Sequence, residues 1–216
     1  ASETLTGYNK TETHRYTYDN RGRITSDTFS NGSGWDEVTS YEYDSRGNLV
    51  KEASFKTAST AAYGTISLEK SEVTYAYDAN NRLTAKDTIT YAGNSVNGFI
   101  KSQKKAQTFG YDTDGNLVRQ VLGTYQVGER EATKDEAETA QRTGIVSIPG
   151  LTSFALADVL NIDGKRYLTF WVPQGEQQVI TSNFDKRGMV TEVRTQYQQM
   201  GEGGTFYTMS SQTTSY

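Results

Sequence analysis

The sequence predicts an all-β fold, an up-and-down antiparallel meander of about 12–14 strands that curls into a soluble barrel or a strongly curved sheet. Composition gives two reasons. Among 216 residues there are 15 Tyr and 20 Gly but only 2 Pro, and a chain rich in Tyr, Thr, Val and Ile favours strands over helices. Only 34% of the residues are hydrophobic, which suits a single layer with a polar face. We expect one domain over residues 1–216, with an insertion at 128–144.

A phrase of about ten residues recurs along the chain and gives the third reason. Its clear copies are YTYDNRGRIT from Tyr16, YEYDSRGNLV from Tyr41, YAYDANNRLT from Tyr75 and FGYDTDGNLV from Phe109. A fifth copy, NFDKRGMVT from Asn183, keeps the centre of the phrase, and LNIDGKRYL from Leu160 is a degenerate sixth. Because the spacing between copies varies, the repeated unit is a local turn with strands of variable length, not a solenoid repeat.

Each copy predicts a β-hairpin turn. Asp at the first position of a type I turn accepts hydrogen bonds from the backbone ahead, and Gly three residues on takes a positive φ. In the third copy Asn81 replaces Gly, and Asn tolerates this conformation best after Gly. In the sixth copy Asn161 replaces Asp. The predicted turn pairs are Asp19–Gly22, Asp44–Gly47, Asp78–Asn81, Asp112–Gly115, Asn161–Gly164 and Asp185–Gly188.

The residues on either side of each turn alternate as they do in strands. Tyr16 and Tyr18 stand two apart and so share a face, and an apolar residue such as Leu49 follows the turn. Packing between adjoining strands then contributes about 0.2–1 kcal/mol for each cross-strand pair. We expect the chain to return at the opposite end through polar, Gly-rich segments, which are SNGSGW (30–35), TASTAAYG (57–64), AGNSVNG (92–98), PQGEQ (173–177) and GEGG (201–204).

Residues 128–160 interrupt this pattern. GEREATKDEAETAQRTG (128–144) is rich in Glu, Ala, Lys and Gln and is helix-prone. It has almost no apolar stripe, so we expect a solvated excursion from the sheet. The next segment, IVSIPGLTSFALADVL (145–160), is the most apolar of the chain. It predicts either a pair of strands or a strand followed by a short helix, so a short helical insertion is expected around 129–160.

Charge and residue content exclude several classes of function. The formal net charge is −4, and the densest basic run, KSQKK at 101–105, is too short to follow a phosphate backbone, so we expect no nucleic-acid binding. With no Cys and one His, zinc and copper sites are not expected. No stretch approaches the ~18 apolar residues of a membrane helix, and the opening ASETLTG has no signal-peptide features.

The YxYDxxGNL phrases resemble the YD repeat of Rhs and teneurin-type surface proteins. The chain is also similar to uncharacterised secreted lipoproteins of Bacteroidetes with a porin-like barrel fold. The resemblance covers most of residues 14–126 and 160–200. It implies an exported protein of the cell surface or periplasm, lipid-anchored to a membrane through a Cys outside this sequence. It carries no catalytic residues, and six copies are too few for the large shells of Rhs and teneurin proteins.

Few residues point to catalysis. His14, the one histidine, is expected to be a strand residue. Plentiful carboxylates leave a paired-carboxylate hydrolase as an alternative, although the repeated aspartates are already assigned to turns. DTDGNL (112–117) lacks the terminal Glu of a calcium loop, and GEGGT lacks the Lys-Ser/Thr of a phosphate loop. We therefore expect no enzymatic activity, no metal and no cofactor.

Three aromatic residues are the candidate ligand contacts. Trp35 and Tyr63 lie on return segments, and Trp171 lies near the end of RYLTFWVP. A Trp among polar residues can stack on a sugar ring, or else both tryptophans pack over a barrel mouth. We expect a non-enzymatic, exported binding or scaffold module for a glycan or small amphiphile. A structural repeat protein that mediates protein–protein contacts and a carboxylate hydrolase are also compatible with the sequence.

Overall fold

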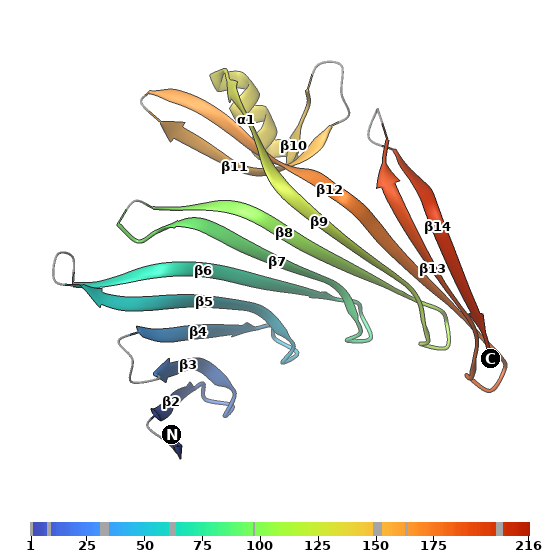
Figure 1. Ribbon diagram of the computed structural model, residues 1–216, viewed down its shortest axis with the longest axis horizontal. Helices are drawn as coiled ribbons and strands as arrows, with labels where there is room; N and C mark the ends of the chain where they lie inside the picture. Colours follow the sequence, from blue (N-terminus) through green and yellow to red (C-terminus); the bar gives the residue numbers. More distant parts are fainter. Residues whose placement is uncertain are drawn as a thin grey trace. The chain divides into compact units, whose positions relative to one another are not determined.

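The computed structural model describes residues 2–7, 10–30, 35–60, 64–96, 98–148, 153–162, 164–201 and 205–216. These residues form fourteen strands and one helix (Figure 1) and divide into two compact units, Ala1–Ser102 and Gln103–Tyr216. The strand pairings within each unit are antiparallel. The predicted all-β antiparallel meander is confirmed.

The first unit is a meander in which each strand pairs with the next in the chain. Its strands are β1 (Ser2–Gly7), β2 (Lys10–Tyr18), β3 (Ile24–Ser30), β4 (Trp35–Tyr43), β5 (Leu49–Thr60), β6 (Gly64–Tyr77), β7 (Leu83–Asn94) and the start of β8 (Gly98–Tyr111). Among the described residues of this unit, Ala53 is the only buried hydrophobic side chain. The unit is therefore a single layer, stabilised by contacts across its strands rather than by a core beneath them.

The second unit is built around β12 (Lys165–Phe184). One edge of β12 pairs with β9 (Leu117–Ala132), which in turn pairs with β8. The other edge pairs with β11 (Phe154–Ile162) as far as Phe170 and with β13 (Val190–Met200) from Glu176 onward. β10 (Ile145–Val146) pairs with β11, and β14 (Phe206–Ser215) pairs with β13. Residues 171–175 thus lie where the two partners of this edge separate.

Taken by itself, each unit is an open sheet. Among the described residues, the pairings of the first unit run in chain order from β1, and those of the second end at β10 and β14. A closed barrel is therefore not formed within either unit.

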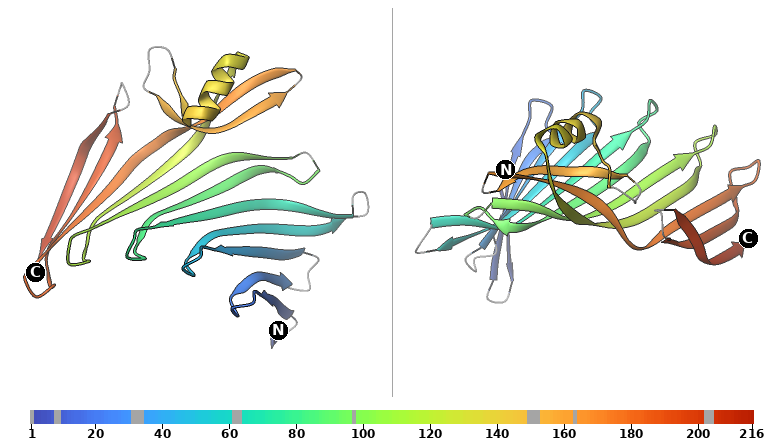
Figure 2. Two further views of the ribbon diagram at one scale, coloured as in Figure 1. Left: turned by 180° about the vertical axis from the view of Figure 1, so that it is seen from behind. Right: turned by 90° about the horizontal axis from the view of Figure 1, so that it is seen from above.

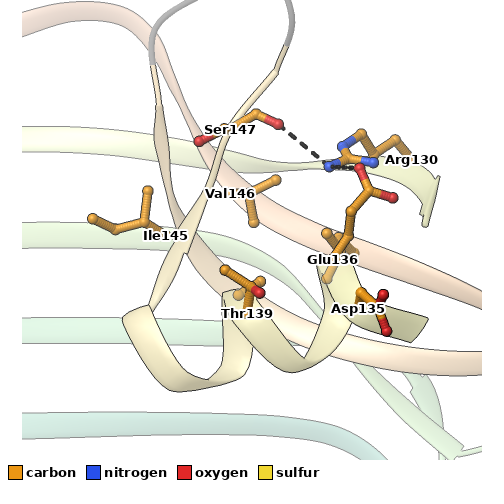
Figure 3. A pocket seen from close by; sticks show the side chains of 9 residues that line it. Arg130, Asp135, Glu136, Thr139, Ile145, Val146 and Ser147 are labelled. Carbon is orange, nitrogen blue, oxygen red and sulfur yellow. Dashed lines mark hydrogen bonds and ion pairs between the residues drawn. The ribbon is translucent and has the colours of Figure 1, made fainter. Parts of the chain in front are cut away.

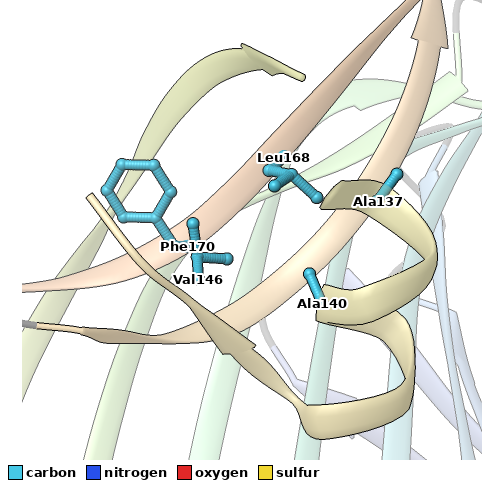
Figure 4. Close-up of a cluster of buried hydrophobic side chains, with 5 residues drawn as sticks. All are labelled: Ala137, Ala140, Val146, Leu168 and Phe170. Carbon is cyan, nitrogen blue, oxygen red and sulfur yellow. The ribbon is translucent and has the colours of Figure 1, made fainter. Parts of the chain in front are cut away.

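A helix, α1 (Lys134–Thr143), lies against β11 and β12 (Figures 1 and 2) and completes the core of the second unit. Figure 4 shows the buried side chains where the helix, β10 and β12 meet. Each is at most 6% exposed, and they are Ala137, Ala140, Val146, Leu168 and Phe170. The two alanines are three residues apart and so lie on one helix face, which brings the helix backbone close to the sheet.

The segment 128–144, expected to be a solvated insertion, is divided between two elements. Residues 128–132 complete β9, and only Lys134–Thr143 is helical. At position 128 the strand packs against the core, and Gly avoids a clash there, because a Cβ would lie 2.6 Å from Phe170 Cε2. The helix begins with a capping box between Thr133 and Glu136 and ends at Gly144, with φ 71°. For residues 145–160 the pair of strands, not the short helix, is correct.

The Asp-centred turns share one geometry. At the first, Arg21 N–H and Arg23 N–H donate to Asp19 Oδ1 at 2.8 and 3.0 Å, and Gly22 N–H donates to Asp19 O at 3.1 Å. Hydrogen bonds from the backbone of Arg23 hold the pKa of Asp19 below its ordinary value. The fourth turn residue has a positive φ in each case, at Gly22, Gly47, Asn81, Gly115 and Gly188.

The degenerate sixth copy forms a different turn. Ile162 pairs with Lys165, and Gly164 takes φ 79° between the two strands. Asn161 pairs with Arg166 and lies in β11, so it is a strand residue and not the first residue of a turn.

Neighbouring turns of the first unit are also bonded to one another. Arg21 Nη1 donates to Ser45 O at 3.3 Å, and Arg46 Nη1 donates to Asp78 O at 3.2 Å. Asn48 Nδ2 donates to Asn81 Oδ1 at 3.0 Å. The repeated phrase therefore specifies both the hairpin and the contact from one hairpin to the next.

Candidate functional site

The candidate ligand site is a cleft of ≈ 280 Å³ in the second unit, which we call the Trp171 cleft. It lies where β11 and β13 separate along one edge of β12. Three aromatic rings, three other apolar side chains, one cation and one hydroxyl line it: Tyr125, Phe154, Trp171, Ala155, Pro173, Met200, Lys104 and Ser153. This volume is close to the lower limit of about 300 Å³ that is usual for small-ligand sites.

The local sequence of β12 explains why the sheet opens here. The segment PQGEQ (173–177), expected to be a return loop, lies inside β12, and the register of β12 on β9 shifts between Gln174 and Gln178. Gly175 takes φ 63° within this bulge. Pro173 has no N–H to donate, which is tolerated at bulges and at strand edges. Bulges bend a strand and often lie next to binding sites because they redirect side chains.

Lys104, Tyr125 and Pro173 form a line across three strands. Lys104 pairs with Tyr125 across β8 and β9, and Tyr125 pairs with Pro173 across β9 and β12. Trp171 lies two residues before Pro173 and so on the same face, and it is 6% exposed. Lys104 Nζ is 4.8 Å from the centre of the Tyr125 ring and 5.4 Å from that of Trp171. The floor of the cleft is therefore aromatic, with a positive charge at one side.

Phe154 joins the cleft to the core. Its ring stacks on Phe170 with 5.4 Å between centroids and 27° between planes. Because Phe170 is 6% exposed and packs in the helix-covered cluster, the wall formed by Phe154 is fixed by buried contacts. A wall of this kind keeps a binding site open without a ligand.

The other predicted ligand contacts lie elsewhere. Trp35 is the first residue of β4 in the first unit, with its ring 5.8 Å from Phe29 and 4.5 Å from Lys56 Nζ. Tyr63 lies outside the described residues. Trp171 is the candidate that lines a cleft with other aromatic rings, Tyr125 and Phe154. Tyr125 was not a candidate from the sequence. It stands two residues before Val127 on a strand, so the sequence could have indicated that these two side chains share one face of the sheet.

His14 is a strand residue, as expected, and is packed among side chains of the first unit. Its Nδ1 is 3.1 Å from both carboxylate oxygens of Asp27, and its ring stacks on Tyr16 at 5.8 Å. Phe29 covers it from a neighbouring strand, 5.0 Å away. Within the part of the chain that the structure describes, no group of three or more His, Asp or Glu side chains is placed to hold a metal ion.

Carboxylates on the first unit are engaged by neighbouring side chains. Tyr75 Oη donates to Glu52 at 2.8 Å, and burial together with this carboxylate raises the pKa of Tyr75 to about 12. Glu72 is partly desolvated, yet Tyr91 Oη at 2.6 Å and Lys70 Nζ at 3.0 Å lower its pKa. A lowered pKa suits an ion-pair partner, whereas the acid of a glycosidase needs a raised one.

A second hollow, of ≈ 290 Å³, lies between α1 and β10 (Figure 3). Arg130 Nη2 lies 3.0 Å from Glu136 Oε1 and 3.3 Å from Ser147 O, so it connects β9, the helix and the chain after β10. Hydrogen bonds from Thr133 and Arg130 lower the pKa of Glu136. The polar groups that line this hollow hold the helix in place, so we assign the hollow a structural role.

The fold defines a class of protein, an all-β antiparallel meander of hairpins. Comparisons with known proteins do not narrow this class further. No protein-family model and no curated protein matches the chain. Among solved structures it is similar to a protein of unknown function from Bacteroides fragilis, at 11% identity and TM-score 0.33 over 95% of this chain and 94% of that one. It is also similar to a porin-like protein from Bacteroides uniformis, at 17% identity and TM-score 0.17 over 100% of this chain and 95% of that one. Neither likeness is close enough to assign a function.

The described residues include no helix that is long and apolar enough to span a membrane.

Proposed function

We propose that the protein is a non-enzymatic binding module and that its Trp171 cleft takes a sugar ring or the ring system of a small amphiphile. The observation that supports this is the aromatic floor formed by Trp171 and Tyr125 in a hollow of ≈ 280 Å³. Sugars and ring amphiphiles both present an apolar C–H face with polar groups at the rim. The apolar face stacks on the aromatic rings, and the rim meets Lys104 and Ser153.

Tryptophan fluorescence tests this proposal directly. The chain has only 2 Trp, so Trp35→Phe leaves Trp171 as the sole tryptophan reporter. We would titrate this variant with neutral and acidic oligosaccharides and with bile-type amphiphiles. The expected result is a saturable change in Trp171 emission with at least one of them.

A second variant places the site. In the Trp35→Phe background, Tyr125→Ala should weaken binding roughly two- to tenfold, since an aromatic contact contributes about 0.5–1.5 kcal/mol beyond its area. Tyr18→Ala is the matched control, because Tyr18 is 47% exposed and lies in the first unit. A flat response across the panel, or equal affinity for both tyrosine variants, would refute a ligand site in this cleft.

We also propose that the repeated turns are YD repeats of an exported protein. The shared geometry of the five Asp-centred turns and the contacts between neighbouring turns support a common repeat unit. Export to the surface or periplasm, with a lipid anchor outside this sequence, stays a prediction of the resemblance. Protease treatment of intact cells that make the natural protein tests it, and complete protection together with recovery in the cytosolic fraction would contradict it.

A further inference from the structure

The outer edge of β14 is an exposed and uncharged strand edge. Every residue of β14 except Phe206 is exposed, and TFYTMSSQTTSY (205–216) has no charged residue and no Pro. Proteins usually protect a strand edge with charges, Pro or a covering element, because its open N–H and C=O groups recruit another strand. At the other end of this unit, β10 has only two residues and contacts α1. The edge of β14 lacks both of these protections among the described residues.

Pairing with β13 fixes which backbone groups of β14 point outward. Tyr216 N–H donates to Thr191 O at 3.0 Å, so Tyr216 belongs to a hydrogen-bonded pair. Such pairs alternate with non-bonded pairs along an antiparallel ladder, and the register is regular from residue 210 onward. Every second residue before Tyr216 therefore bonds to β13, and the residues between them direct N–H and C=O to the open edge. These outward residues are Ser211, Thr213 and Ser215.

We propose that this edge pairs with β14 of a second copy of the chain, antiparallel and centred on Thr213. A two-fold axis at Thr213 places this residue opposite its own copy and Ser211 opposite Ser215 of the other copy. Each of the three residues whose backbone groups point outward then lies opposite such a residue of the other copy, and each pair exchanges two hydrogen bonds. The stretch is thus complementary to itself, as an interface with two-fold symmetry requires. Because it carries no charge, no like charges oppose each other across the axis.

Exposed apolar side chains flank this edge. Tyr207 is 50% exposed, Met209 54% and Tyr216 78%. In the proposed register Tyr216 lies opposite Ser210 of the second copy, so pairing would cover part of the Tyr216 side chain as well as the open backbone groups. One strand pair is small beside the roughly 1,200–2,000 Å² of a stable interface, so we expect a weak dimer with a Kd in the micromolar range or above.

Charge substitutions at the axis test the proposal. By sedimentation velocity over a range of concentrations, the unmodified chain should show a reversible monomer–dimer equilibrium. Thr213→Lys or Thr213→Glu places like charges opposite each other, and each should raise the Kd about fivefold or more. An equimolar mixture of the two variants should restore the dimer, which a folding defect would not do. Thr108→Lys, which adds the same charge at an exposed position of β8, should leave the Kd unchanged.

Hydrogen exchange locates the contact. On raising the concentration, the amides of Ser211, Thr213 and Ser215 should exchange more slowly, whereas those of Gln212 and Thr214 already bond to β13 and should change little. A chain that stays monomeric up to about millimolar concentration overturns the proposal. So does a dimer that is insensitive to both charges at position 213, because its interface must lie elsewhere. This surface is distinct from the Trp171 cleft, so the outcome is independent of ligand binding.

Discussion

Replacing Gly128 by Ala should destabilise the second unit much more than one methyl group usually does. A Cβ at this position would lie 2.6 Å from Phe170 Cε2 and 2.9 Å from Val172 Cγ2, both closer than real Cβ contacts allow. Phe170 has little room to move, because it is 6% exposed and stacks on Phe154 at 5.4 Å. Overpacking of a well-packed core typically costs about 1–3 kcal/mol. In a chain of this length that corresponds to a fall in Tm of roughly 2–12 °C.

The assay is thermal and urea unfolding followed by circular dichroism, with Gly110→Ala as the matched control. Gly110 also lies in a strand of the second unit, but a Cβ there would be 3.5 Å from Arg119 Cβ, an ordinary contact. Its substitution should be neutral or slightly stabilising, because Ala reduces the entropy of the unfolded chain. Equal stability of the two variants would refute the packing argument at Gly128. If the argument holds, Gly128→Ala should also weaken ligand binding, because displacement of Phe170 moves the Phe154 wall of the cleft.

Three further predictions concern the core, the helix cap and the turns. Leu168→Ala should reduce the free energy of unfolding by about 2–5 kcal/mol in urea titrations, since Leu168 is 1% exposed, whereas Leu117→Ala, at 37% exposed, should cost far less. Thr133→Ala removes the side chain that caps α1 and should cost about 0.5–2 kcal/mol in the same assay, and no change would contradict a folded helix end. The pKa values of Asp19, Asp78 and Asp112 are lowered in the folded state by hydrogen bonds from Arg23, Arg82 and Asn116. These carboxylates thus stabilise the fold above the ordinary Asp pKa of 3.8, and this stability is lost as the pH falls through their folded pKa values. Replacing all three by Asn should flatten the dependence of Tm on pH below about pH 4, and an unchanged slope would contradict it.

The repeated turns could be predicted from sequence because their physics is local. Asp19 and Gly22 need only each other and the intervening backbone, and the same holds where Asn81 replaces Gly. Asn161 shows the limit of this reasoning. Its copy keeps Gly164, but the pairing of Ile162 with Lys165 shortens the loop and moves Asn161 into a strand. Register is set by the facing strand, which the phrase alone does not contain.

Two other segments show how the same residues can serve different structures. Pro173 and Gly175 predict a return loop when considered alone, but in the structure they form a bulge within β12. The helix at 134–143 has no large apolar stripe, and it packs through Ala137 and Ala140, whose small side chains give a weak signal in sequence. In both cases the deciding contacts come from strands that are far away in the chain.

The position of the Trp171 cleft follows from the shape of a single-layer sheet. Such a sheet has no interior, so its hollows lie on an open face, beneath a covering element or where neighbouring strands separate. In the second unit, α1 covers a face, and the polar groups beneath it are used to hold the helix. Where β11 and β13 separate, no described strand pairs with the edge of β12 at Trp171, and Tyr125 lies beside this stretch on the neighbouring strand β9. Trp171 was a candidate from the sequence because it is aromatic, but its partners are brought together by the change of pairing along β12. Deleting the bulge residues 175–176 would let β13 pair further toward Phe170, and it should abolish ligand binding while the helix-covered core stays folded.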